Sequence, residues 1–437
     1  MALSLPCRIL TAHREIFAQL DEIYTHIDGV FGPKNTFLAV MALKAAHRSV
    51  NYRDVLKEMH QEWQWLGWES TPSAGALSKA RAHLDVEDCR EVWQEAVVRA
   101  QATFPSRVSA LPGRRIYAFD ATRVVSPGTA GARKRWGSPT GKDNKKHHNP
   151  QSMMVAAWEL TTGIPLDIAL LGYKGSERLG ANRILKSLKK GDVAVFDRGY
   201  HGREFFSGFL AHGVDIVARM PSVVDSTWKE IEPFLASKED DAIVNMDLGD
   251  GLGKRLMRLV RRRFLPGAPK KGQPRDKMII MTTLLDQEAY PLEVILDLYS
   301  RRWDIETRFR EMKHQYGLES FHSNRVDGVE QEIYAVLTWM TLSAMVQGMA
   351  EKAVDKMHGY QEWTDPITLR CSKPSRRQYR ARARRQIRRG LEQCRVEQDR
   401  QRIIVRRRCL LGGLLLTLAS SLRRPRPESS PIMQHSP

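Results

Sequence analysis

Short apolar runs alternate with helical patterns through the middle of the chain, and this alternation constrains the fold more than any other feature. Runs of strand length lie at 116–119, 153–158, 164–171, 193–196 and 214–219. Thr161-Thr162-Gly163 separates two of them and indicates a hairpin. Residues 181–190 and 203–212 have the apolar spacing of helices. The pattern predicts a mixed α/β core.

The segment before this core has a helical pattern. Residues 1–108 show apolar spacing of helical type throughout. Within them, residues 52–60 predict one short helix, and Ser70-Thr71-Pro72 supplies the cap and first-turn proline of a second, which carries Lys79 and Arg81. This pair is either a helix-turn-helix module or part of a bundle with surface Lys and Arg, and both interpretations stay open. We assign 1–108 as a helical N-terminal DNA-binding domain.

The second half of the core predicts a β-rich insertion followed by two helices. Segments 242–248, 255–261 and 278–285 have strand character within an insertion at about 222–285. A helix is expected from Pro291 to about Tyr316, where Gly317 offers a stop, and a further apolar helix at 330–350. The catalytic domain is therefore assigned to 109–350.

The chain is strongly basic, and the excess charge is concentrated at its end. The 437 residues carry a net charge of +19, which favours a polyanionic partner such as nucleic acid. Residues 370–408 hold sixteen Lys and Arg against three acids. We assign 351–437 as a basic, Arg-rich, partly disordered C-terminal region, with a folded DNA-binding element as the alternative. The loop at 133–148 is also basic and is expected to be mobile without DNA.

The cysteines and apolar runs indicate a soluble protein of a reducing compartment. The five cysteines are scattered singly, so neither a disulfide framework nor a thiolate zinc site is expected. The longest apolar stretch, near 409–422, is shorter than the roughly 20 residues of a membrane-spanning helix. No membrane partner is therefore expected.

Two aspartates are expected at the ends of short strands. Asp120 follows the run at 116–119 and Asp197 follows the run at 193–196. A rigid sheet can hold carboxylates at its edge for metal-dependent catalysis. Each residue alone is a weak signal, because an aspartate after a strand is more often a turn former or a helix cap.

A stronger signal is the stretch YSRRWDIETRFREMK from residue 299. Tyr299, Arg302, Glu306 and Lys313 fall within an arc of roughly 60° on one continuous helix. Glu311 points away from this face, so Glu306 is the candidate ligand. The competing interpretation is a solvated helix laced with ion pairs.

With these residues, the sequence resembles the DDE transposases of bacterial insertion sequences, specifically the insertion-sequence-four group. The resemblance rests on Asp120 in AFDAT, Asp197 in VFDRGY and the signature that contains Glu306, and spans roughly residues 110–350. It implies an RNase H-like α/β core in which these three acids bind two Mg²⁺, with Mn²⁺ as a substitute. It also implies that Tyr299, Arg302 and Lys313 hold DNA near the cleaved end.

Other basic and aromatic residues beside the motifs have expected roles of their own. Arg198, Arg219 and Arg310 are candidate phosphate contacts. Trp303 is expected to pack against the core rather than to stack on a base.

The function expected from the resemblance is cut-and-paste transposition. The reaction sequence is nicking at an element end, hairpin formation by the freed 3′ hydroxyl, hairpin opening and transfer into target DNA. The expected partners are double-stranded DNA, as element ends and target, and a second copy of the chain in the DNA complex, in the bacterial cytoplasm at the nucleoid. Two rivals stay open: a catalytically inactive end-binding protein and an RNase H-like nuclease that cuts without strand transfer.

Overall fold

The computed structural model describes residues 30–45, 51–62, 66–103, 111, 113–140, 149–221, 228–249, 252–263 and 277–357. The chain divides into two compact units, one of residues 6–346 and one of residues 1–5 with 347–437. Of the second unit, only the end of helix α13 (Val326–Met357) is described. The basic region expected beyond that helix, and residues 141–148 of the basic loop, lie outside the described residues.

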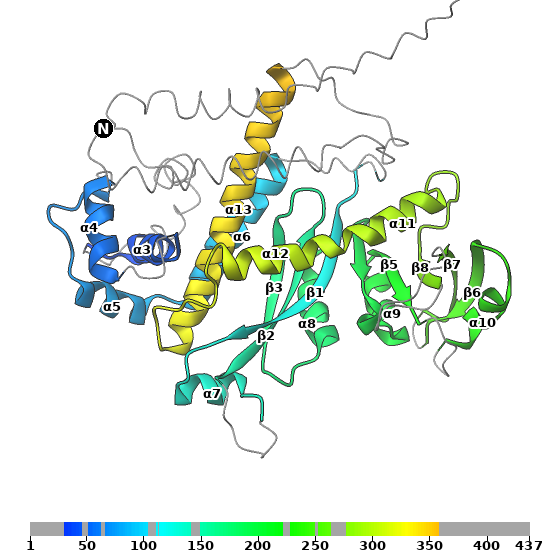
Figure 1. Ribbon diagram of the computed structural model, residues 1–437, viewed down its shortest axis with the longest axis horizontal. Helices are drawn as coiled ribbons and strands as arrows, with labels where there is room; N and C mark the ends of the chain where they lie inside the picture. The colour runs from blue at the N-terminus through cyan, green and yellow to red at the C-terminus, as the bar shows by residue number, and fades with distance from the viewer. Residues whose placement is uncertain are drawn as a thin grey trace, which may run out of the picture. The chain divides into compact units, whose positions relative to one another are not determined.

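An eight-stranded mixed sheet organises the larger unit (Figure 1). Its strands are β1 (Ile116–Val125), β2 (Gln151–Glu159), β3 (Pro165–Leu171), β4 (Val193–Phe196), β5 (Asp215–Met220), β6 (Asp241–Asp247), β7 (Lys254–Arg263) and β8 (Lys277–Thr282). They lie in the order β3-β2-β1-β4-β5-β8-β7-β6. The neighbours β1, β4 and β5 are parallel, and the remaining pairs are antiparallel. This mixed α/β fold is consistent with the RNase H-like core that the resemblance implied.

The strands expected in the β-rich insertion extend the core sheet. β8 pairs with β5 from Val217 opposite Thr282 to Met220 opposite Ile279, and β7 and β6 follow outward. The hairpin predicted around residues 161–163 is present as β2 and β3.

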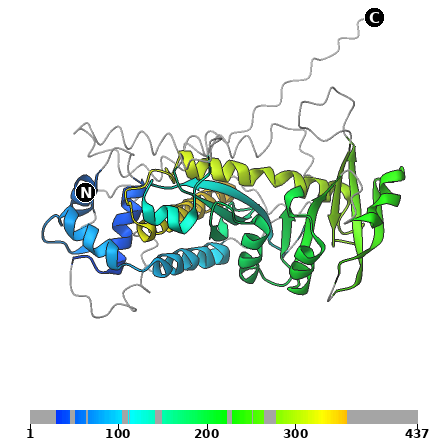
Figure 2. The same cartoon turned by 90° about the horizontal axis from the view of Figure 1, so that it is seen from below.

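Helices cover both faces of the sheet. The N-terminal segment forms α3 (Pro33–Ala45), α4 (Tyr52–Glu62) and α5 (Ala74–His83), which pack on one another, and α6 (Val86–Thr103), which contacts β3. The core adds α7 (Ala130–Trp136), α8 (Glu177–Ile184), α9 (Arg203–Ala211), α10 (Glu232–Ala236), α11 (Leu292–Arg301) and α12 (Trp303–His314). In Figure 2, α11 and α12 run along one face of the sheet, and α8 and α9 lie on the other. Among the described residues, no helix is both long and apolar enough to cross a membrane.

Two local expectations were wrong. The helix expected at 181–190 begins earlier, as α8, and ends in a 3₁₀ turn at Leu185–Ser187. Within the basic loop, residues 133–136 are helical as part of α7, because Thr129 caps that helix by accepting a hydrogen bond from the Ala132 N–H (3.2 Å).

An aromatic cluster joins the central strands to α9. The ring of Phe196 in β4 lies 5.0 Å from Phe119 of β1 and 4.9 Å from Phe209 of α9, centroid to centroid. All three rings are buried. Because successive side chains of a strand point to opposite faces, these contacts turn the neighbouring residue of β1, Asp120, toward the face that α12 covers.

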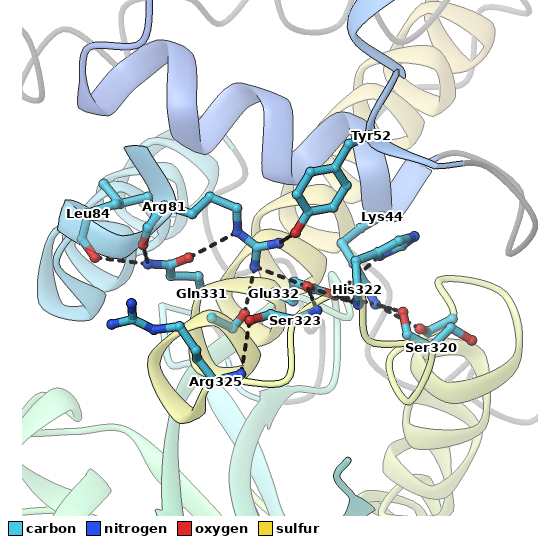
Figure 3. Close-up of polar contacts among 12 residues, drawn as sticks. Lys44, Tyr52, Arg81, Leu84, Ser320, His322, Ser323, Arg325, Gln331 and Glu332 are labelled. Carbon is cyan, nitrogen blue, oxygen red and sulfur yellow. Dashed lines mark hydrogen bonds and ion pairs between the residues drawn. The ribbon is translucent and has the colours of Figure 1, made fainter. Parts of the chain in front are cut away.

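A buried carboxylate ties the N-terminal helices to α13 and to the loop before it (Figure 3). Glu332 is fully buried and accepts hydrogen bonds from the guanidinium of Arg81 (3.0 Å) and from the backbone N–H of His322 and of Ser323 (both 3.0 Å). The ammonium of Lys44 lies 3.4 Å from the same carboxylate. Burial by itself would raise the pKa of Glu332, but the hydrogen bond with the His322 side chain and the charges of Arg81 and Lys44 lower it to about 2.

Arg81 was expected on the surface, and this expectation was wrong. Its side chain is 5% exposed, and its backbone carbonyl accepts a hydrogen bond from the Gln331 side chain (2.9 Å). The same amide donates to the carbonyl of Leu84 (2.8 Å). The ion pair of Arg81 with Glu332 and the two hydrogen bonds of the Gln331 side chain therefore join the end of α5 to α13.

We expect Glu332→Gln to lower the free energy of unfolding by about 3 kcal/mol at pH 7, because it leaves buried cations without their counter-charge. The folded-state pKa of Glu332 lies below the unfolded value, so its contribution is present above pH 4.5 and is lost as the pH falls toward 2. Denaturant titration of the wild type and of Glu332→Gln should therefore show a difference in the free energy of unfolding that becomes smaller as the pH falls. Asp327→Asn, in an exposed pair on the same helix, is the control and should change stability by less than about 0.5 kcal/mol. A difference in unfolding free energy that stays constant from pH 7 to pH 3 would contradict the lowered pKa of Glu332.

Candidate active site

Asp120 and Asp197 reach the same region from neighbouring parallel strands. Asp197 directly follows β4, as expected, and its carboxylate accepts a hydrogen bond from the Gly199 N–H (2.7 Å). Asp120 was expected to end its strand, and this was wrong, because β1 continues to Val125. Asp120 instead lies just beyond the part of β1 that pairs with β4, which ends at Ala118. Asp120 therefore lies past the end of the parallel pairing between β1 and β4.

The signature stretch does not form one continuous helix. α11 ends at Arg301, α12 begins at Trp303, and Arg302 lies at the junction. Tyr299 therefore belongs to α11, and only Glu306 and Lys313 belong to α12.

The apolar face of α12 fixes the helix against the sheet. Ile305, Phe309 and Met312 are buried along one face of the helix. The ring of Phe309 packs edge-on against Trp158 of β2, with centroids 5.6 Å apart. Glu306 follows the buried Ile305 and lies at the edge of the buried face of α12, with its side chain 37% exposed.

Arg302 joins two of the predicted acids. One guanidinium nitrogen lies 3.7 Å from Asp120 Oδ2, and the other lies 3.6 Å from Glu306 Oε1. The side chain is 9% exposed, and its Nε has no hydrogen-bond partner among the described residues. The guanidinium carbon lies 6.0 Å from the ring centre of Tyr299. The structure thus brings Asp120, Tyr299, Arg302 and Glu306 together.

The site concentrates negative charge. The pKa of Asp120 is raised to about 6, first by burial and then by the charges of Asp197 and Glu177, against the opposing effects of the Ala121 N–H and of Arg302. Burial also raises the pKa of Tyr299, which Arg302 opposes. The negative charges of Asp120, Asp197 and Glu177 would attract a cation to this site.

Glu177, the first residue of α8, was not among the predicted site residues. Burial raises its pKa, and the nearby charge of Asp197 raises it further. In the sequence, an acid in the first turn of a helix is ordinary, because it favours the helix dipole. The only available signal was its position after the hairpin strands, which does not distinguish it from other helix-start acids.

The remaining predicted DNA contacts are dispersed. Lys313 is engaged with β1, since its ammonium donates to the carbonyl of Arg123 and lies 3.1 Å from Glu319. Arg219 is partly buried and influences the pKa of Tyr299. Arg198 and Arg310 are exposed. The structure therefore places Lys313 in contact with the strand that carries Asp120.

Trp303 was expected to pack against the core, and this was wrong. Its side chain is the most exposed of the large hydrophobic residues described, at 61%. It lies beside Arg302, whose guanidinium carbon is 5.7 Å from its ring centre. An exposed indole next to the acidic cluster is available to stack on a base.

Comparison with known proteins identifies the family. A family model described as the transposase DDE domain matches residues 111–342, more than half of the chain. This chain belongs to the transposase DDE domain family. It is also 25% identical over 225 residues to the transposase InsG for insertion sequence element IS4 of Escherichia coli (strain K12), a match over 50% of this chain and 48% of that protein. The chain therefore spans about half the length of this curated relative, and its recognition as a DDE transposase of the insertion-sequence-four type is confirmed.

Transposases of the DDE family generally use divalent metal ions. Among the described residues, no group of three or more His, Cys, Asp or Glu side chains is already arranged to hold a metal ion. The donor chemistry nevertheless fits, because Asp120, Asp197 and Glu306 offer only carboxylate oxygens, which Mg²⁺ and Mn²⁺ favour. Burial raises the pKa of Asp120 first, and the nearby charges of Asp197 and Glu177 add to the increase, so a bound metal ion would stabilise the ionised form of Asp120. The guanidinium of Arg302 lies against two of these carboxylates.

The exposed position of Trp303 predicts that its side chain contributes little to folding. Trp303→Ala should change the free energy of unfolding by less than about 0.5 kcal/mol, whereas Phe309→Ala, on the buried face of the same helix, should cost roughly 3–5 kcal/mol. Denaturant unfolding of the two variants measures the contrast. Equal losses in both variants would mean that Trp303 packs in solution.

Proposed function

We propose that this transposase cleaves the ends of an insertion sequence and joins them to target DNA in a metal-dependent reaction. The observation that carries the proposal is the meeting of Asp120 and Glu306, from β1 and α12, at one guanidinium beside Asp197. The catalytic roles of these three carboxylates are part of the proposal. The steps are nicking, attack of the freed 3′ hydroxyl on the opposite strand, hairpin opening and strand transfer.

In this proposal, Asp120, Asp197 and Glu306 hold two Mg²⁺, for which Mn²⁺ can substitute. Bound there, the two ions would activate the attacking oxygen and stabilise the leaving oxygen of an in-line displacement. Asp120 is buried enough to strengthen its electrostatic interaction with any cation, and its position on a paired strand limits its movement.

The basic residues around the acids have separate proposed roles. Arg302 holds the acids together before DNA arrives and then binds a phosphate near the cleaved bond. Tyr299, beside it, contributes a phenolic hydroxyl to the same DNA end. Lys313 secures β1, and with it the position of Asp120. Arg198, Arg219 and Arg310 add contacts to the DNA backbone.

The domain organisation is also a proposal. Residues 1–108 would bind the element ends, 109–350 would form the catalytic domain with its insertion at about 222–285, and 351–437 would add basic affinity for DNA. Pairing of two ends would make the active complex a homodimer on DNA, at the bacterial nucleoid in the cytoplasm.

The central test compares Glu306→Gln with Glu311→Gln on a duplex that carries the inverted repeats flanking this gene. Glu306→Gln should lower the rate of metal-dependent end cleavage by at least about a hundredfold, because a carboxylate donor to the metal is lost. Glu311 pairs with Arg308 on the same helix, so its variant should cleave normally. Gel-shift titration should show affinities within about twofold of the wild type for both.

The rival functions give different results in the same assay. Cleavage by Glu306→Gln at the wild-type rate would remove Glu306 from the mechanism. Specific end binding without any cleavage by the wild type would support the inactive end-binding protein, and cleavage without joining would support the nuclease.

The exposed Arg310 gives a second prediction, on salt dependence. Arg310→Ala should make the plot of log binding constant against log salt shallower by about 0.9, the contribution of one phosphate contact. Arg301, whose guanidinium is bound to Asp297 (2.8 Å), provides the matched control. Filter-binding titrations from 50 to 200 mM salt measure both slopes, and an unchanged slope for Arg310→Ala would place this residue outside the interface.

A further inference from the structure

Glu177 and Asp197 approach the same backbone position from different elements. A β-carbon built on Gly199 would lie 3.1 Å from Asp197 Oδ1 and 3.9 Å from Glu177 Oε2. The carboxyl groups of Asp197 and Glu177 therefore both lie close to the backbone of Gly199, where a larger residue would crowd them. Asp197 comes from the end of β4 and Glu177 from the start of α8.

Close packing of α8 holds Glu177 at this place. Gly180, one turn along the helix, is buried, and a β-carbon there would collide with the side chain of Val155 in β2. The absence of a side chain at 180 lets the start of the helix approach the sheet. Glu177 is consequently half-buried beside Asp197 instead of extending into solvent.

The carboxyl groups of Glu177 and Asp197 form no ion pair with a described residue. Among the described residues, the Glu177 carboxylate forms no hydrogen bond or ion pair, and the Asp197 carboxylate accepts a hydrogen bond only from the N–H of Gly199. Arg123 lowers the pKa of Glu177 through its charge, but its guanidinium donates to the carbonyl of Tyr173. Two partly buried carboxylates without a bound counter-charge are costly unless a cation joins them.

Tyr200 provides an independent indication that a ligand belongs here. Its side chain is fully buried, and its hydroxyl has no hydrogen-bond partner among the described residues. Burial raises its pKa, the nearby charges of Glu177, Asp120 and Asp197 raise it further, and the charge of Arg302 opposes them, so the hydroxyl lies in the neighbourhood of these three acids. A buried donor without an acceptor is unfavourable, and a hydrated cation between the acids would bring oxygen atoms within its reach.

We infer that Glu177 is a fourth metal-binding carboxylate of this centre, which shares a divalent cation with Asp197, and that Tyr200 donates a hydrogen bond to the occupied site. The inference rests on the proposed function, because it uses the site formed by Asp120, Asp197 and Glu306. It adds to that site a residue from the opposite face of the sheet and a neutral donor. The helix-dipole role that Glu177 has by position does not require it to face Asp197.

The test measures Mn²⁺ binding to the full-length protein without DNA, by the loss of the free-ion signal in electron paramagnetic resonance. Glu177→Gln should weaken the tightest Mn²⁺ site by at least about tenfold. The matched control is Glu204→Gln, which removes an exposed acid from the first turn of α9 and alters net charge equally. This control should bind Mn²⁺ like the wild type, and a thermal unfolding midpoint should confirm that each variant is folded.

Tyr200→Phe separates a role at the metal from a role in folding. Because the hydroxyl has no partner in the metal-free protein, its removal should leave the metal-free unfolding midpoint unchanged or raise it. It should still weaken Mn²⁺ binding, by severalfold. A lower metal-free midpoint with unchanged Mn²⁺ affinity would overturn the assignment of Tyr200.

The outcomes distinguish this inference from the proposed function. Loss of Mn²⁺ binding in Asp197→Asn, with wild-type affinity in Glu177→Gln, would overturn the inference and leave the proposed function standing. Wild-type affinity in both Asp120→Asn and Asp197→Asn, or no Mn²⁺ binding by the wild type, would contradict the proposed metal site and the inference together.

Discussion

The position of the Arg302 guanidinium between Asp120 and Glu306 is the interaction on which the arrangement of the site depends. A strand and a helix each deliver a carboxylate to the same small volume, where two like charges repel. The guanidinium offsets that repulsion from the junction of α11 and α12. Because its side chain is nearly buried, the interaction is screened less than a surface ion pair.

One face of the sheet carries the aromatic core, and the other carries the carboxylates of the site. Phe119 and Phe196 pack with α9 on one face, and the residue that follows each of them is an aspartate of the site. The alternation of side chains along β1 therefore couples the burial of the Phe119 ring to the placement of the Asp120 carboxylate on the opposite face. On that face, the contact of Phe309 with Trp158 places α12, and hence Glu306, at a defined distance from the strand. A strand and a helix thus hold Asp120 and Glu306 in place, and Asp197 is positioned by the end of β4 directly before it.

Local patterns predicted much of this arrangement, and long-range contacts account for what was missed. The strands, the hairpin and Asp197 after β4 were readable because each depends on neighbours in the sequence. Arg81 was misassigned to the surface because its partner Glu332 lies 251 residues away. The continuation of β1 past Asp120 depends on its pairing with β2, which the apolar run at 116–119 does not report. Glu177 lies near Asp197 because α8 packs closely on the sheet, and no spacing rule in the sequence places it there.

The metal site proposed at Asp120, Asp197 and Glu306 is tested most directly by the position of Mn²⁺ in a crystal of the full-length protein soaked in manganese chloride, located by anomalous scattering. We expect a peak within about 2.2 Å of carboxylate oxygens from Asp120 and from at least one of Asp197 and Glu306. The guanidinium of Arg302 should then have moved away from the carboxylates that bind the ion. A peak elsewhere on the protein, with Arg302 still between Asp120 and Glu306, would contradict the proposed metal site.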